Sequence, residues 1–194
     1  MLYTLELLQQ KGELKNVNHW CGTSIGSICA LFMNINISPK EIFPLLKEIN
    51  KYFFITPKSI LKIPDTFGLI SHEPFKKLLS KVLEKKGILS TVTFQQLYQF
   101  TKQTLSVFAN NINKNKLHCF NYINSPNVCI IDAILASCSI PIVFPIYTID
   151  NEKYIDGASI SDWSYDEQII SEPSETLLIY TMYEPDNSSI RKND

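Results

Sequence analysis

A serine between two glycines is the feature of this 194-residue chain that most directly suggests chemistry. Gly22-Thr23-Ser24-Ile25-Gly26 has the G-x-S-x-G spacing of a nucleophile elbow, a tight strand-to-helix turn that exposes the serine hydroxyl to substrate. We expect both glycines to be required because a Cβ there would collide with the crossing backbone. Residues 17–21 predict the incoming strand and residues 27–33 the outgoing helix. Ser24 is therefore a candidate nucleophile.

A serine hydroxyl needs a base to take its proton, and the histidines are poorly placed for that role. The chain has three of them, His19, His72 and His118. An α/β-hydrolase triad runs serine, acid, histidine, and no histidine follows His118. His19 lies five residues before Ser24 on the incoming strand, too far back to reach the elbow. We expect all three histidines to be structural side chains.

A carboxylate is the other candidate base. In Tyr154-Ile155-Asp156-Gly157-Ala158 an apolar strand ends in an acid, and the small residues after it allow close approach of another backbone or a substrate. An acid at the end of a strand can reach the same rim as an elbow serine. From these residues alone two interpretations stay open: Asp156 is the base for Ser24, or it begins an ordinary Asp-Gly turn.

Composition and charge narrow the partners and the compartment. The net charge of -1 and the pI near 6.3 disfavour nucleic acid as a partner. Five cysteines without C-x-x-C or zinc-ligand spacing predict reduced thiols, a reducing compartment and no bound metal. Neither a signal-peptide pattern nor an apolar run of membrane-spanning length is evident, so we expect a cytoplasmic chain that meets lipid only peripherally, at membrane surfaces.

The order of predicted elements indicates an α/β layered domain. We expect helices over 1–11, 38–52, 75–86, 93–101 and 132–138, and strands over 104–109, 117–122, 153–155 and 176–183. The strands on either side of the polar stretch 110–116 are typical of a hairpin or of two adjacent strands. Residues 54–74 contain prolines and no clear period, which predicts a loop. The chain is expected to form a single domain over 1–183, followed by a polar tail over 184–194.

The predicted helix 75–86 is strongly amphipathic. Its apolar stripe consists of Phe75, Leu78, Leu79, Val82 and Leu83, and its lysines are Lys76, Lys77, Lys81, Lys85 and Lys86. Two interpretations stay open for this basic face. It is either the solvated side of a helix packed on the core, or a surface that attracts anionic lipid headgroups.

Three segments, in order along the chain, resemble a patatin-like phospholipase, a family of serine lipid acyl hydrolases. They are Trp20-Cys21-Gly22-Thr23-Ser24-Ile25-Gly26-Ser27, Asp132-Ala-Ile-Leu-Ala-Ser-Cys-Ser-Ile-Pro-Ile-Val-Phe-Pro145 and Tyr154-Ile155-Asp156-Gly157-Ala158. The similarity extends loosely from Met1 to about Tyr183. It implies a three-layer α/β/α patatin-like fold.

The resemblance also implies a mechanism and a substrate class. By position, Ser24 corresponds to the nucleophile and Asp156 to the base of a catalytic dyad that uses no histidine. The motif residues of this hydrolase pattern are Gly22, Gly26, Gly157 and Ala158. The implied substrate is an ester bond of a phospholipid or related acyl lipid, and no cofactor or metal is implied.

Two departures from the family pattern qualify this expectation. Family members carry a glycine-rich oxyanion loop ahead of their first helix, whereas this sequence starts at Met1 within that helix, which predicts an N-terminally truncated fold. The backbone N–H of Ile25 is then the one oxyanion donor that we can place. Asp162 and Ser164 stand where an Asn and a Pro often follow the aspartate motif. The alternative hypothesis is a catalytically impaired or inactive patatin-like protein that binds lipid or acts as a scaffold, or a truncated product.

Overall fold

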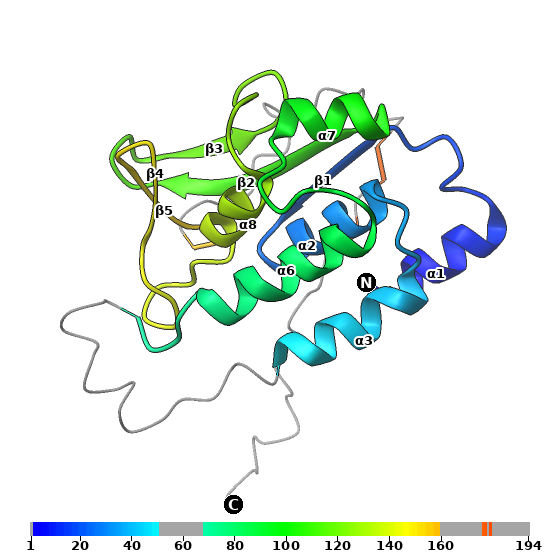
Figure 1. The fold of residues 1–194 in the computed structure, drawn as a ribbon, viewed down its shortest axis with the longest axis horizontal. Helices are drawn as coiled ribbons and strands as arrows, with labels where there is room; N and C mark the ends of the chain where they lie inside the picture. Colours follow the sequence, from blue (N-terminus) through cyan, green and yellow to red (C-terminus); the bar gives the residue numbers. More distant parts are fainter. Residues whose placement is uncertain (1, 51–67, 160–175, 178, 180–194) are drawn as a thin grey trace, which may run out of the picture.

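The computed structural model describes residues 2–50, 68–159, 176, 177 and 179 (Figure 1). Its helices are α1 (Leu2–Lys11), α2 (Ile25–Asn34), α3 (Pro39–Asn50), α6 (Glu73–Lys85), α7 (Phe94–Thr101) and α8 (Ile130–Ser137). Its strands are β1 (His19–Thr23), β2 (Thr104–Asn111), β3 (Lys116–Phe120), β4 (Tyr147–Ile149) and β5 (Glu152–Asp156). This mixture confirms the predicted α/β class.

Most of these elements lie where the sequence predicts them. The helix after the candidate nucleophile begins earlier than expected, at Ile25, directly after Ser24. The short strand β4 is not predicted, because three residues between Pro145 and a turn at Asp150 give too short a pattern to detect. The predicted strand 176–183 is absent at residues 176, 177 and 179, and its other residues lie outside the described part of the chain. Residues 54–67 of the predicted loop and the polar tail also lie outside it.

Two almost wholly apolar helices, α2 and α8, pack on one face of the sheet, and α6 lies in front of them in Figure 1. Alternate residues of a strand point to the same face, so Leu105, Val107 and Ala109 of β2 enter the core shared with both helices. Their complete burial from water is the main stabilising contribution to this layer. Ser106, Phe108 and Asn110 of β2 alternate with these residues, point to the other face of the sheet and are buried as well.

Strand β2 organises the sheet because one of its edges is shared by two other strands. β3 pairs antiparallel with Val107–Asn111 along one edge, as the predicted hairpin requires. The other edge pairs first with parallel β1, up to the pair Thr23 and Phe108, and then with antiparallel β5, from the pair Asp156 and Ala109. The C-terminal ends of β1 and β5 therefore meet at neighbouring residues of β2. A residue just after Thr23 is thus brought next to Asp156.

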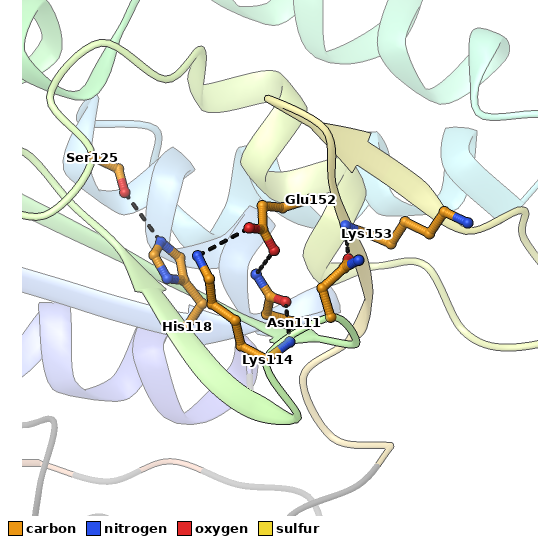
Figure 2. Close-up of polar contacts among 7 residues, drawn as sticks. Asn111, Lys114, His118, Ser125, Glu152 and Lys153 are labelled. Carbon is orange, nitrogen blue, oxygen red and sulfur yellow. Dashed lines mark hydrogen bonds and ion pairs between the residues drawn. The ribbon is translucent and has the colours of Figure 1, made fainter.

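The far end of β5 is fastened to the β2–β3 turn by a polar network (Figure 2). Glu152 accepts a hydrogen bond of 3.0 Å from the Asn111 side chain and forms an ion pair of 3.1 Å with Lys114. The backbone N–H of Lys114 donates to Asn111 Oδ1, and that of Lys153 donates to Asn113 Oδ1. Nearby, Figure 2 shows His118 bonded to Ser125 at 3.2 Å. These contacts fix the strand that ends in Asp156.

Helix α6 buries its whole apolar stripe, and its lysines are exposed. This confirms that the stripe packs on the core. Binding of anionic headgroups by the lysines stays a prediction. No helix within the described ranges is long and apolar enough to cross a bilayer.

Candidate active site

The turn at Ser24 has the strained geometry of an elbow. Ser24 has φ 52° and ψ −129°, a conformation that residues with a side chain rarely adopt, and it occupies the N-cap of α2. A Cβ on Gly22 would lie 2.3 Å from the backbone of Gly26, so the prediction for Gly22 is confirmed. The prediction for Gly26 is wrong, because a Cβ there would point into open space. Gly22 alone allows the two backbone segments to cross.

Two fully buried serine hydroxyls hold the peptide groups of Ser24. Its N–H donates to Ser137 Oγ at 2.8 Å, and the Ser137 hydroxyl donates to the carbonyl of Phe108 at 2.6 Å. Its carbonyl accepts from both the backbone N–H and the hydroxyl of Ser27, at 2.9 and 2.6 Å. A strained backbone conformation persists only where surrounding contacts hold it in place, and these hydrogen bonds hold Ser24 on both sides.

The backbone around Asp156 is held by contacts from three elements. The Asp156 N–H donates to the carbonyl of Ser139 at 2.9 Å, just past the end of α8. The buried Asn110 amide donates to the carbonyls of Asp156 and Gly157, both at 3.0 Å. A Cβ on Gly157 would lie 2.7 Å from both the Phe108 carbonyl oxygen and Thr23 Cγ2. The small residue after the acid therefore allows the close approach that the sequence suggests.

Both open interpretations of the Asp156 segment are compatible with its local structure. The N–H of Ser159 donates to the Asp156 carbonyl at 3.1 Å, which closes a four-residue turn. The same turn brings the Ala158 N–H to Asp156 Oδ1 at 2.8 Å. Forming a turn therefore does not remove the carboxylate from the elbow; it fixes one of its oxygens.

The Asp156 side chain is only 3% exposed, and its two oxygens differ. Oδ1 is bonded to the Ala158 N–H, whereas Oδ2 is buried without an aligned hydrogen-bond partner among the described residues. Burial raises the pKa of Asp156 above its ordinary value, and hydrogen bonding from the Ser24 hydroxyl and the Ala158 N–H opposes that rise. The structure thus brings Ser24 and Asp156 together, and Oδ2 is the carboxylate oxygen that the Ala158 N–H does not hold.

A thiol adjoins the same pair. Cys138 is buried, and this burial, together with the charge of Asp156, raises the pKa of its thiol. Interactions with the hydroxyls of Ser27 and Ser24 act in the opposite direction. The thiol therefore stays protonated at neutral pH and packs as a small neutral group beside the elbow.

The three histidines are each hydrogen-bonded to a serine hydroxyl outside the Ser24–Asp156 pair. His19 bonds Ser106 at 2.8 Å, and His72 bonds Ser139 at 3.0 Å. Burial lowers the pKa of all three histidines, that of His72 to about 4, so they are neutral at pH 7. These contacts agree with the expected structural role.

The backbone N–H of Ile25 is the first of helix α2, and no hydrogen bond within the described part of the chain engages it. The first N–H groups of a helix are unpaired by geometry, and the helix dipole adds a partial positive charge there. This position is suited to a developing oxyanion next to Ser24.

A cavity of ≈ 440 Å³ lies elsewhere, between α3 and α6. It is lined by Leu45, Glu48, Glu73, Pro74, Lys77, Leu78, Lys81, Val82 and Lys85. None of these residues belongs to the elbow or to the Asp156 turn, so the cavity is separate from the candidate active site.

The family follows from comparison with known proteins. The family model described as patatin-like phospholipase matches residues 1–162. The chain belongs to the patatin-like phospholipase family. Its curated relatives include a probable lipid hydrolase, 463L, of Invertebrate iridescent virus 6, which is 29% identical over 158 residues. That match covers 80% of this chain and 54% of the relative.

A second relative is the uncharacterized protein R571 of Acanthamoeba polyphaga mimivirus, 24% identical over 154 residues. That match covers 78% of this chain and 50% of R571, so the chain spans about half the length of both curated relatives. Among solved structures, this patatin-like chain resembles VipD from Legionella pneumophila, with a TM-score of 0.58, 14% identity, and coverage of 82% of this chain and 43% of VipD.

The type III effector protein ExoU is similar with a TM-score of 0.50 and 15% identity, over 71% of this chain and 36% of ExoU. At such identities the two likenesses show the patatin-like fold alone.

Sequence reasoning proposed Ser24 and Asp156 as the reacting pair, which the structure brings together, but it missed the side chains that hold them. Ser137 falls within the segment 132–145 that resembles the family, yet its type and position gave no role. Ser27 and Asn110 gave no signal either, because a buried polar residue is recognised only once its partners are known.

Proposed function

We propose that this patatin-like chain is a serine acyl hydrolase that cleaves ester bonds of phospholipids or related acyl lipids. The observation that carries the proposal is the meeting of a strained elbow serine, Ser24, with a buried carboxylate, Asp156, whose pKa is raised by burial and lowered by hydrogen bonding from the Ser24 hydroxyl. The relative named as a probable lipid hydrolase supports the choice of lipid as the substrate class.

In the proposed acylation step, Asp156 Oδ2 accepts the proton of the Ser24 hydroxyl while Oγ attacks the ester carbonyl carbon. The resulting tetrahedral intermediate carries a negative oxygen, which the Ile25 N–H and the α2 dipole stabilise. The bond to the alcohol then breaks. The leaving alcohol takes the proton from Asp156, and the acyl group stays on Ser24 as an ester.

Deacylation uses the same groups in reverse. Asp156 accepts a proton from a water molecule whose oxygen attacks the acyl carbon. Collapse of the second tetrahedral intermediate breaks the bond to Ser24 Oγ and releases a fatty acid. The proton then returns from Asp156 to Ser24. No histidine is needed, which accords with the engagement of all three in other contacts.

Labelling with a serine-directed fluorophosphonate tests the proposal, together with hydrolysis of a short-chain acyl ester and of phospholipid vesicles. We expect the wild-type protein to be labelled and Ser24→Ala not to be. Ser106→Ala is the matched control, because Ser106 is another buried serine that bonds only outside the site. It should keep both labelling and hydrolysis.

Labelling that persists in Ser24→Ala would overturn the assignment of the nucleophile. A folded wild-type protein that binds lipid vesicles but shows no Ser24-dependent labelling or hydrolysis would favour the alternative, a non-catalytic patatin-like protein that binds lipid or acts as a scaffold.

A further inference from the structure

We infer that Ser137 is a positioning residue for the nucleophile, which it holds through the backbone of Ser24. The inference rests on the proposed function, because it assigns a role within the same site. Ser137 is the last residue of α8, its side chain is fully buried, and it lies 113 positions from Ser24 in sequence.

The hydrogen bonds of Ser137 fix the direction of its hydroxyl. A hydroxyl has one proton to donate and lone pairs to accept with. Because the Phe108 carbonyl can only accept, the Ser137 proton goes to it, over 2.6 Å. A lone pair is left to receive the Ser24 N–H, at 2.8 Å. The two hydrogen bonds therefore form a chain whose donors all point the same way, from the Ser24 N–H through the Ser137 hydroxyl to the Phe108 carbonyl. Hydrogen bonds in such a chain polarise and strengthen one another.

The endpoint of that chain matters because Phe108 lies where the two halves of the site meet. Phe108 pairs with Thr23, the residue before Ser24, and its neighbour Ala109 pairs with Asp156. Ser137 therefore ties the elbow to the position on β2 that also sets the place of the acid. Its hydroxyl helps to define how Ser24 Oγ lies relative to the carboxylate.

Within the described part of the chain, the Ser137 hydroxyl is the one hydrogen-bond partner of the Ser24 N–H. Ser27 holds the carbonyl of Ser24, but from the same helical turn, so it moves with the elbow. Ser137 is fully buried, whereas Ser24 is half-buried. Without the Ser137 hydroxyl, the Ser24 N–H would lose its hydrogen-bond partner in this part-buried position, which costs the energy of that bond. The strained φ of Ser24 would lose one of its restraints, and the nucleophile would be free to rotate away from Asp156.

The test compares Ser137→Ala with two other variants. Ser137→Thr keeps the hydroxyl, and Ser106→Ala removes a buried hydroxyl of β2 that lies outside the site. With a short-chain ester we expect Ser137→Ala to lower kcat by about 10- to 100-fold, the scale of a small misplacement of a reacting group, with little change in KM. Ser137→Thr should recover most of the rate. Ser106→Ala should keep the wild-type kcat even where its melting temperature falls.

A second readout does not depend on turnover. In the wild-type protein the amide proton of Ser24 should exchange slowly with solvent, and it should exchange faster in Ser137→Ala. If Ser137→Ala fails to fold, Ser137→Cys retains a similar volume with a much weaker acceptor, and the same two measurements apply to it.

The inference is overturned if a folded Ser137→Ala or Ser137→Cys keeps the wild-type kcat and the slow exchange of the Ser24 amide. It is also overturned if Ser137→Thr behaves like Ser137→Ala, because the hydroxyl would then not be the group that matters. A wild-type protein without Ser24-dependent labelling would remove both the proposed function and this role, whereas labelling with an unchanged Ser137→Ala removes this role alone.

Discussion

The two ends of β5 each carry a carboxylate, and the two carboxylates differ in how completely they are hydrogen-bonded. At the Glu152 end, both carboxylate oxygens have partners, Asn111 and Lys114, and the Asn111 amide uses both its nitrogen and its oxygen (Figure 2). At the Asp156 end, Oδ2 has no aligned partner among the described residues, and neither does the nearby Thr23 Oγ1. The backbone at Ser24 is strained as well. Both carboxylate oxygens at the Glu152 end therefore have a partner, whereas one at the Asp156 end lacks an aligned partner within the described part of the chain.

This difference indicates which contacts hold the fold and which serve a site. A buried polar atom without a partner lowers stability, so it persists where something other than stability is selected. Positive φ alone does not separate the two ends, because Asp150 and Asn151, just before Glu152, also adopt it, as Asp and Asn in turns tolerate. Ser24 differs because its ψ of −129° lies outside the left-handed helical region. The saturated network at Glu152 keeps β5 in register and needs no further explanation. We therefore expect substitutions at the Asp156 end to separate stability from activity, and those at the Glu152 end to affect neither strongly.

The largest effect is expected for Asp156→Asn, which keeps an oxygen for the Ala158 N–H but removes the base. Activity should fall by about 10²- to 10⁴-fold, the usual contribution of general acid–base catalysis. Stability at pH 7 should rise, because the raised pKa of Asp156 means that its ionised form is disfavoured in the fold. Turnover and urea unfolding at a series of pH values measure both.

The sign of the pH dependence gives the control. The pKa of Asp156 is higher in the folded protein than in the unfolded chain, where it is near 3.8. Below pH 3.8 the carboxyl group is protonated in both states and does not destabilise the fold. As pH rises through the folded pKa, ionisation of Asp156 lowers the free energy of unfolding. The stability advantage of Asp156→Asn should therefore be largest at neutral pH and shrink toward pH 4. An advantage that is constant with pH would contradict this account of the carboxylate.

The next effect concerns the stability of glycine and alanine variants at Ser24, where we expect the glycine variant to be the more stable, the reverse of the usual order. Ser24→Gly and Ser24→Ala should both be inactive, but Ser24→Gly should be the more stable. Relief of a strained backbone contributes about 1–3 kcal/mol, while the entropy of glycine offsets roughly 0.5–1 kcal/mol of it. Urea unfolding of the two variants measures the difference.

Ser106 in β2 provides the matched comparison for this reversal. It lies within a strand and is not among the residues at positive φ, so Ser106→Gly should be less stable than Ser106→Ala. If the alanine variant were the more stable one at Ser24 as well as at Ser106, the elbow would not be strained in solution.

What the sequence could predict here was local. The Gly22 requirement follows from a crossing of residues only four apart, and the β2–β3 hairpin from two strands joined by a short polar turn. The amphipathic helix α6 and the position of α7, predicted over 93–101 and observed over Phe94–Thr101, are likewise set by neighbours along the chain. These elements were found at nearly their observed places.

What could not be predicted depends on residues far apart in sequence. The shared edge of β2, where β1 stops and β5 begins, brings Thr23 and Asp156 to neighbouring positions from 133 residues apart. Ser137 and Asn110 acquire roles only through that arrangement. Gly26 fails for a different reason, because the direction of its absent Cβ, into open space, depends on the exact path of the turn. Motif spacing specifies residue types and leaves such directions open.

The smallest effect is expected for Glu152→Gln, and it tests whether the two ends of β5 are independent. The change keeps an acceptor for Asn111 and removes only an ion pair with Lys114, whose side chain is 53% exposed. Exposed ion pairs contribute about 0–1 kcal/mol, and salt screens them. Stability should therefore fall by less than about 1 kcal/mol at low salt, and by less still at 1 M salt, with kcat unchanged. A loss of activity as large as that of Ser137→Ala would mean that the register of β5, and not the local hold on Ser24, sets the geometry of the site.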